Sequence, residues 1–526
     1  MKTLDSEPIG LGARLLSLLA AFVFLDQWLD HTTPLTTAQY KSVSVALAFL
    51  TSSWVATIGA VSLFALVILF KPIRRPWSEE QLESGWRVFS IGVAGMLAWW
   101  LVTLGPNHAH GQTYIFDRLL ILAFLVASYR WPIFLLPFVV LAYALAHQIS
   151  VPAIGGPVLP HKLLLLEGVC LIVVWQVLRG AGLPIRRKDA LLLLACLIAG
   201  RYWYPGYGKF MLDWTQFAHV QNAVYSAYGH GFTNWLPVQT VTSFAGYLGH
   251  FSWLMIWFVL LFELGFLLMV VNRWATLLLI AAAILFHFGV FVLFGFLFWT
   301  WIVMDILFVY LLLQHVRLPE TSPYSLWATI VSIPLIILTP IWSDPSRLAW
   351  FDTGMSYVTR FYAVGQSGQM YQLSPKFFQP YDDNMKFSFF GYLYPDRATL
   401  AGPYGASSDL DVARAVQDAK TPKEIFAIET ERAAEKPGNE ERIEIFHDLL
   451  REYIANWNDG CMCKPWWSAL QPPPQFWTYP WSDELPVYVA QEPIREVQII
   501  GVTTWFNGET IQEIRREDAG KVEIPL

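Results

Sequence analysis

The sequence predicts a mainly α-helical, polytopic membrane bundle, followed by a mixed α+β domain outside the cytoplasm. Of the 526 residues, 55% are hydrophobic and only 14% are charged, whereas soluble domains carry about 25% charged residues. Long apolar runs recur throughout residues 1–343, and a spanning helix needs about 20 such residues. Residues 344–526 are polar and mixed. A segment of that length can bury a core of its own.

Composition and cysteine content narrow the function classes. The net charge is −6, and no basic stripe with interleaved aromatics is present, so we expect no nucleic-acid partner. The pair Cys461 and Cys463 stands alone as Cys-x-Cys and could form a strained disulfide, two free thiols or half a metal site. Without a second pair nearby, we expect no catalytic metal site. Cys170 and Cys196 lie in apolar runs and are interpreted as packing residues.

We expect about eleven spanning helices in residues 1–343. The first run carries Asp26 and lacks a small-residue cleavage site, so we interpret it as a retained helix. The polar-free run Phe291–Trp301 allows either a tight hairpin or one long helix. The predicted spans are Leu11–Leu29, Val43–Phe70, Val88–Leu104, Tyr114–Tyr129, Pro132–Gln148, Lys162–Leu178, Ala190–Tyr204, Tyr247–Val271, Thr276–Phe294, Phe298–Gln314 and Leu326–Ile341.

The basic residues predict the orientation of these spans. If the spans alternate, the loops after the second, fourth, sixth, eighth and tenth lie on one side. These loops carry Lys71, Arg74, Arg75, Arg130, Arg179, Arg186, Arg187, Lys188, Arg273 and Arg317. The positive-inside rule makes that side cytoplasmic. We therefore predict a multi-pass cell-membrane protein with a cytoplasmic N-terminus and an extracytoplasmic C-terminal domain.

The outer side then carries a long polar loop and the C-terminal domain. The loop, Pro205–Thr240, is too polar to span, and we expect it to lie along the membrane or re-enter the protein. In the C-terminal domain, 344–403 is interpreted as loops with short strands. Residues 409–456 have helical periodicity, which a Pro-Gly break at 437–438 divides into two helices.

The chain end is expected to form strands. Residues 487–489, 496–504 and 510–515 alternate between apolar and polar side chains, as strands do. Asn507-Gly508 is typical of a hairpin turn. Trp466, Trp467, Trp477 and Trp481 would suit either a protein interface or a domain resting on the bilayer.

Several ionisable groups interrupt apolar runs, and charge within a membrane is rare and often functional. Each also has a structural explanation. Asp117 and Arg118 could hold helices together, Glu263 could neutralise Arg201 or Lys209, and a lone histidine is commonly a helix contact. The groups are Asp117, Arg118, Glu167, Glu263, His287 and Asp305.

Lys209 is the most informative of the charged residues. It lies among glycines and aromatics in the run 204–214, YPGYGKFMLDW. A buried lysine is costly near hydrocarbon, and desolvation lowers its pKa, so that it can act as a base. The structural alternative is that Lys209 extends to the membrane surface.

The run 204–214, the long polar loop, a helix with Glu263 and a helix with Phe286-His287 together resemble the HTTM superfamily, which includes vitamin K-dependent gamma-glutamyl carboxylase. The resemblance covers about residues 10–345, with its specific part at about 200–300. It implies that Lys209 is the base that deprotonates a quinol at the outer membrane face. The chain departs from the carboxylase where Gln112 occupies the position of a catalytic histidine, with His108 and His110 nearby.

Two functions follow. In the first, Lys209, Glu263 and His287 are catalytic, and Tyr204, Tyr207 and Trp214 bind a lipid-like cofactor such as an isoprenoid quinol. Tyr204, Tyr207 and Phe210 desolvate Lys209 in this hypothesis. In the second, the chain is a non-catalytic scaffold in membrane lipids, whose C-terminal domain binds an extracytoplasmic protein or peptide. A pocket at Lys209 would favour the enzyme, whereas a direct ion pair with Glu263 would make the lysine structural.

Overall fold

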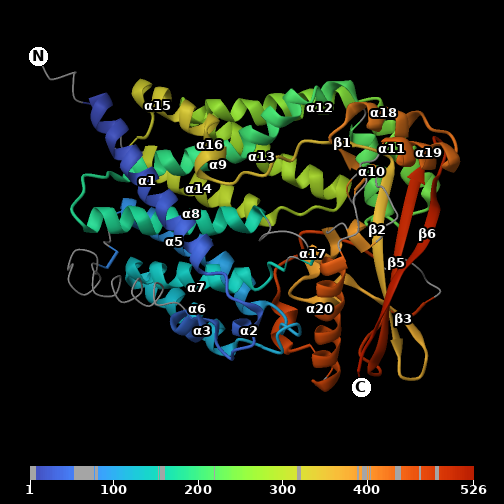
Figure 1. Ribbon diagram of the computed structural model, residues 1–526. Helices are drawn as coiled ribbons and strands as arrows, with labels where there is room; N and C mark the ends of the chain where they lie inside the picture. Colours follow the sequence, from blue (N-terminus) through green and yellow to red (C-terminus); the bar gives the residue numbers. More distant parts are fainter. Residues whose placement is uncertain are drawn as a thin grey trace, which may run out of the picture.

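The computed structural model shows helices that run side by side, with a sheet across one end of them (Figure 1). It describes residues 7–52, 76–77, 81–151, 153–154, 160–217, 219–316, 322–387, 390–393, 400, 402, 404–432, 440–460, 462, 464–479 and 485–525.

Apolar runs become helices throughout residues 7–342. The helices are α1 (Glu7–Thr32), α2 (Thr37–Tyr40), α3 (Val45–Ser52), α5 (Gln81–Thr103), α6 (Ile115–Arg130), η2 (Pro132–Phe134), α7 (Leu135–His147), α8 (Pro160–Gly180), α9 (Arg187–Met211), η3 (Trp214–Gln216), α10 (His219–Gly229), α11 (Val238–Gly249), α12 (Ser252–Gly265), η4 (Phe266–Val270), α13 (Arg273–Phe294), α14 (Trp299–Val316), α15 (Leu326–Ile337) and α16 (Thr339–Trp342).

Within the described residues, five helical segments are long and apolar enough to cross a membrane: Gly10–Thr32, Ser84–Thr103, Ser252–Val270, Arg273–Phe294 and Trp299–Val316. The membrane character of the bundle is therefore supported, and the count of eleven crossings stays a prediction. The apolar helices Pro132–His147 and Leu326–Ile337 are shorter than the roughly 20 residues that a bilayer core requires. Most of the predicted span Val43–Phe70 lies outside the described residues.

The structure decides one question that the sequence left open in the bundle and corrects one predicted boundary. The run Phe291–Trp301 is a hairpin, because α13 ends at Phe294 and Gly295 adopts φ +77°. The predicted loop Pro205–Thr240 is wrong at its start, because α9 continues through Pro205 to Met211. Membrane helices tolerate proline because neighbouring groups satisfy the freed carbonyl. The remainder of this segment forms η3, α10 and the start of α11.

The C-terminal part is built on a four-stranded antiparallel sheet of order β3-β2-β5-β6. The strands are β2 (Met355–Gly365), β3 (Met370–Leu373), β5 (Ile494–Phe506) and β6 (Ile511–Glu523), and β1 (Phe351–Asp352) pairs separately with β4 (Ala406–Ser407). The predicted hairpin at Asn507-Gly508 is confirmed, with Gly508 at φ +97°. Val487 makes only an isolated bridge.

Three helices, rather than the expected two, follow the first strands. They are α18 (Leu410–Asp418), α19 (Pro422–Arg432) and α20 (Glu440–Asp459). The additional break falls before Pro422, since the residue preceding a proline disfavours helical dihedrals. The expected break at 437–438 lies outside the described residues. Short helical segments η6 (Pro375–Phe378), α17 (Asp382–Phe387), η7 (Gly391–Leu393) and η8 (Trp466–Leu470) complete this part.

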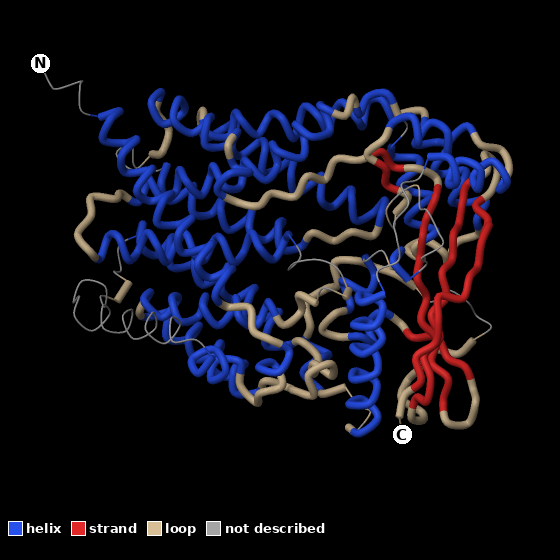
Figure 2. Tube along the Cα trace, viewed as in Figure 1, coloured by secondary structure: helices blue, strands red, loops and turns tan. Residues whose placement is uncertain are grey.

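The sheet lies across the ends of the long helices (Figures 1 and 2). Hydrogen bonds between the two parts include Tyr381 Oη to Asn107 Oδ1 at 3.0 Å, Leu297 N to Gln475 O at 2.8 Å and Trp99 Nε1 to Leu470 O at 2.6 Å. One hydrophobic cluster extends from the bundle into the sheet. We call this end of the bundle the sheet end.

Candidate functional site

Helix α9 positions the predicted lysine at the sheet end. Its side chains are buried along most of its length, because α1, α8, α12 and α15 pack around it. Tyr202, Gly206 and Lys209 recur at helical spacing on the face toward α12. A Cβ atom on Gly206 would lie 2.7 Å from the Glu263 Cβ. The glycine therefore allows α12 to approach closely enough for Glu263 to reach Lys209.

Lys209 forms a buried ion pair with Glu263. Its Nζ donates to Glu263 Oε1 at 2.7 Å and to Oε2 at 2.8 Å, and the two residues are only 7% and 4% exposed. Trp214 covers the ammonium, with 5.4 Å between Nζ and the ring centroid. A buried charge needs a partner of this kind. The predicted proximity to Glu263 is confirmed, and it is the arrangement expected of a structural lysine.

His287 of α13 belongs to a second buried cluster. This cluster is centred on Tyr202, which lies two helical turns before Lys209 on α9. The Tyr202 hydroxyl donates to Asp305 Oδ2 at 2.9 Å and lies 2.9 Å from His287 Nε2. Since a hydroxyl carries one proton, donation to Asp305 leaves it to accept from Nε2–H. His287 Nδ1 is then a bare acceptor, and it has no hydrogen-bond partner among the described residues.

The aromatic residues predicted to bind a cofactor have separate positions. Tyr204 is half-buried and packs against the main core, whereas Tyr207 is 40% exposed and stacks on Trp203. Trp214 is buried, and its Nε1 donates to Trp350 O at 2.7 Å. The expectation that Phe210 desolvates Lys209 is wrong, because Phe210 is 62% exposed. Among the described residues, none of the three predicted aromatics lines the cavity at Glu167 or the cavity beside the sheet.

Trp214 connects the lysine to a histidine that the sequence placed only in the outer loop. His219, at the start of α10, stacks on the Trp214 ring at 3.9 Å and bonds the Trp214 carbonyl through Nε2 at 2.9 Å. Its Nδ1 lies 3.6 Å from Asp352 Oδ2. Burial lowers the pKa of His219 below its usual value. This chain of contacts joins α9, α10 and β1.

Asp117 and Arg118 have a structural role, as expected if they hold parts of the bundle together rather than take part in chemistry. Asp117 accepts from Ser44 Oγ, Val45 N and Ala46 N, each at 2.9 Å, and so caps the start of α3. Arg118 donates to four backbone carbonyls in residues 102–113. Both groups are therefore fully engaged in holding the loops at the sheet end.

Glu167 belongs to an acidic cavity of about 230 Å³ that the sequence did not predict. Arg201 Nε donates to Glu167 at 3.1 Å, and Ser343 Oγ donates to it at 3.0 Å. Asp26 bonds the Tyr143 hydroxyl. The lining includes four carboxylates, those of Asp26, Asp30, Glu167 and Asp344. Asp26 within the first apolar run was the available signal, but the residues that join it come from α7, α8 and the segment after α16.

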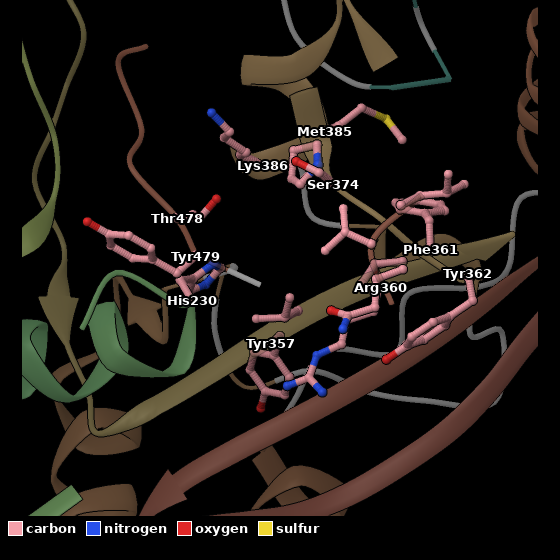
Figure 3. Close-up of a pocket in the computed structure, with 16 residues that line it drawn as sticks. His230, Tyr357, Arg360, Phe361, Tyr362, Ser374, Met385, Lys386, Thr478 and Tyr479 are labelled. Carbon is pink, nitrogen blue, oxygen red and sulfur yellow. The ribbon is translucent and has the colours of Figure 1, made fainter. Parts of the chain in front are cut away.

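A second cavity, of about 80 Å³, lies beside the sheet (Figure 3). His230 and Tyr479 line one side, Arg360 comes from β2, and Lys386 comes from α17. Lys386 Nζ donates to Phe476 O at 2.8 Å. His230 stacks on Tyr404 at 3.6 Å. The lining combines basic and aromatic side chains, which suits a polar or anionic group.

The segment around Gln112 is a tight loop, in which Asn107 and Gln112 form a bridge. Gln112 Nε2 donates to Lys41 O at 2.9 Å. His108 packs edge-on against Tyr453 and Trp457 of α20, and His110 stacks on Tyr40. Burial lowers the pKa of both histidines to about 4. Neither histidine lines either of the two cavities.

The Cys-x-Cys pair was the candidate for half of a metal site. Cys461 and Cys463 lie outside the described residues. Among the residues that are described, no group of three or more His, Cys, Asp or Glu side chains is arranged to hold a metal ion. Comparisons with protein-family models, with curated proteins and with solved structures find no match to the chain.

Proposed function

We propose that this protein is a membrane-anchored scaffold whose C-terminal part binds an extracytoplasmic protein or peptide. The observation that carries the proposal is the two-oxygen contact between Lys209 and Glu263. A general base needs a free proton-accepting atom and access to its substrate. The Lys209 ammonium donates to both carboxylate oxygens and is covered by Trp214, so it is not open to a substrate.

The connection between bundle and sheet supports the same proposal. Tyr381 donates to Asn107 on the bundle at 3.0 Å, and Trp467 Nε1 donates to the Leu104 carbonyl at 3.3 Å. Asn456 donates to the His108 carbonyl at 2.7 Å. Such contacts, together with a shared hydrophobic cluster, fix the sheet relative to the bundle. A scaffold needs this rigidity so that a bound partner keeps one orientation to the membrane.

The cavity in Figure 3 is the surface we propose for the partner. Its lining of His230, Arg360, Lys386 and Tyr479 fits an acidic side chain or a chain terminus, because cations and aromatic edges both attract carboxylates. At about 80 Å³ it admits a single side chain rather than a large ligand. The rest of the partner would then lie over the neighbouring exposed residues of the 464–479 segment.

The proposal is tested with the full-length protein in detergent and a soluble quinol, menadiol. A scaffold predicts that menadiol leaves the thermal midpoint unchanged, since only a ligand that binds the folded state raises it. An acidic peptide should raise that midpoint in the parent protein but not in a Lys386→Met variant. A menadiol-induced rise that Lys209→Met abolishes would instead support a quinol-binding site at Lys209.

One observation favours the enzyme as a second candidate. Tyr202, His287 and Asp305 form a buried hydrogen-bonded chain that leaves His287 Nδ1 without a described partner. Such a chain can move a proton between donor and acceptor. The proton acceptor would then be His287 rather than Lys209. This candidate predicts that menadiol, as the proton donor, raises the thermal midpoint of the parent protein and of Lys209→Met but not of His287→Phe.

A further inference from the structure

Helix α11 carries no charged residue. Its sequence from Val238 to Gly249 contains no Asp, Glu, Lys or Arg. It packs on α10 through Val241 and Ala245, which are 3% and 0% exposed. Many of its other side chains are exposed. A surface helix on a water-soluble domain normally carries charge on its outer face.

The exposed side of α11 separates into two stripes. Phe244 and Tyr247 of α11, with Phe251 two residues beyond its end, recur at intervals of three and four residues, and they are 46%, 62% and 44% exposed. The exposed Thr240 falls within this apolar stripe at the start of the helix. The exposed polar residues Gln239 and Ser243 form the second stripe. At about 3.6 residues per turn, these residues lie on the side of the apolar stripe that is away from the packed face.

The apolar stripe continues directly into a membrane span. The span Ser252–Val270 begins one residue after Phe251. Its first turns expose Trp253, Leu254 and Trp257. At a rise of about 1.5 Å per residue, the end of α11 is within a few ångströms of the start of that span. The apolar stripe of α11 and the exposed apolar residues at the start of the span therefore lie next to each other.

We propose that α11 is an interfacial helix whose apolar stripe inserts among lipid acyl chains while Gln239 and Ser243 face the headgroups and water. The occupant of this surface is the lipid bilayer. Tyrosine, tryptophan and phenylalanine suit this boundary because each has an apolar ring. Since α11 has no cationic side chain, the attraction comes from apolar area and is independent of anionic lipid. The proposal concerns anchoring and does not depend on the scaffold function.

Site-directed fluorescence in the full-length protein tests the proposal. In a Cys461→Ser, Cys463→Ser background, Phe244→Cys and the matched control Ser243→Cys are each labelled with the probe NBD. The labelled proteins are placed in phosphatidylcholine vesicles that contain a lipid with a nitroxide high on its acyl chain. Quenching by the nitroxide should be several-fold stronger at position 244 than at 243, whereas aqueous iodide should quench 243 more strongly.

The same comparison with Tyr247→Cys and Gln239→Cys serves if Phe244→Cys does not fold. Replacing part of the phosphatidylcholine by phosphatidylglycerol should leave both signals unchanged. Equal quenching at 243 and 244 would overturn the proposal. Protection of position 244 from both quenchers, with cross-linking between two copies at that cysteine, would also overturn it and assign the stripe to a dimer interface.

Discussion

At the scale of single residues, Lys209 shows how a buried charge becomes part of the structure. A lysine near hydrocarbon must find an acceptor or lose its proton, and this requirement was evident from the sequence. The identity of its partner was not, because Glu263 is on another helix and reaches Lys209 only past the bare backbone of Gly206. The lysine was predictable, and its environment depended on helix packing.

A double-mutant cycle measures this ion pair. Lys209→Met leaves the Glu263 carboxylate buried without its partner, and breaking a buried pair costs about 3–5 kcal/mol of unfolding free energy. Lys209→Met combined with Glu263→Leu should recover most of that loss, because no buried charge remains. Denaturant unfolding in detergent micelles measures both values. A single variant as stable as the parent protein would show that the pair contributes nothing to folding.

His108 predicts how stability depends on pH. Its folded-state pKa is about 4 because burial disfavours the charged ring, whereas an unfolded histidine titrates near pH 6.5. The unfolded chain therefore binds the proton first, so stability is full above about pH 6.5 and falls as the pH drops toward 4. The loss for this residue is roughly 3 kcal/mol.

The expected readout is a thermal midpoint that decreases from pH 7 to pH 4. His108→Phe keeps a ring between Tyr453 and Trp457 and should make this decrease smaller. His31→Phe, at an exposed site on α1, is the control and should leave the slope unchanged. Identical slopes in the parent and the His108 variant would contradict the burial argument.

At the scale of secondary structure, elements that depend on a local sequence pattern were predictable, whereas strand pairing between distant parts of the chain was not. The apolar runs predicted the helices of the bundle, because burial in lipid or among helices needs only a long apolar segment. The hairpin at Asn507-Gly508 was equally local. By contrast, β2 pairs with β5 from the far end of the chain, so its length could not be inferred from residues 344–403 alone. Tyr204, Tyr207 and Trp214 likewise could not be placed from the sequence, because contacts with residues distant in the chain determine their surroundings.

Close helix packing gives a prediction at this scale. A Cβ atom on Gly200 of α9 would lie 1.8 Å from Thr339 Oγ1 of α16, so Gly200→Ala forces the two helices apart. Overpacking of this kind costs about 1–3 kcal/mol. The matched control is Gly95→Ala on α5, where no atom lies within 4 Å. That variant should equal the parent or gain about 0.5–1 kcal/mol.

Unfolding by graded SDS in mixed micelles compares the two variants. A Gly200→Ala protein as stable as Gly95→Ala would show that α16 can move without cost. The comparison isolates packing, because both substitutions add one methyl group within a long helix.

At the scale of the whole molecule, the basic residues and the sheet lie at opposite ends. Arg130 ends α6, Arg179 is in the last turn of α8, and Arg273 begins α13, and the helices run from these ends toward the C-terminal part that carries the sheet (Figure 1). This separation is what the positive-inside argument requires. How the sheet docks on the bundle was beyond the sequence, since those contacts join residues far apart in the chain.

Cysteine labelling in intact cells tests the orientation. With Cys461 and Cys463 replaced by serine, Glu509→Cys marks the hairpin of the sheet, and Leu183→Cys marks the exposed turn between α8 and α9. A membrane-impermeant maleimide should label position 509 and leave 183 unlabelled until the cells are lysed. Labelling of 183 alone would reverse the predicted topology.

The order of the strands also affects how this protein is made. The strand β2 pairs with β3 within a few residues, but its other edge is completed only by β5, near the end of the chain. At about 5–20 residues per second, the ribosome takes on the order of ten seconds to reach that strand. During this interval the β2 backbone presents an open hydrogen-bonding edge. Newly synthesised chains should therefore depend on a chaperone that covers this open edge. Depletion of that chaperone should reduce the number of chains that survive until β5 is synthesised.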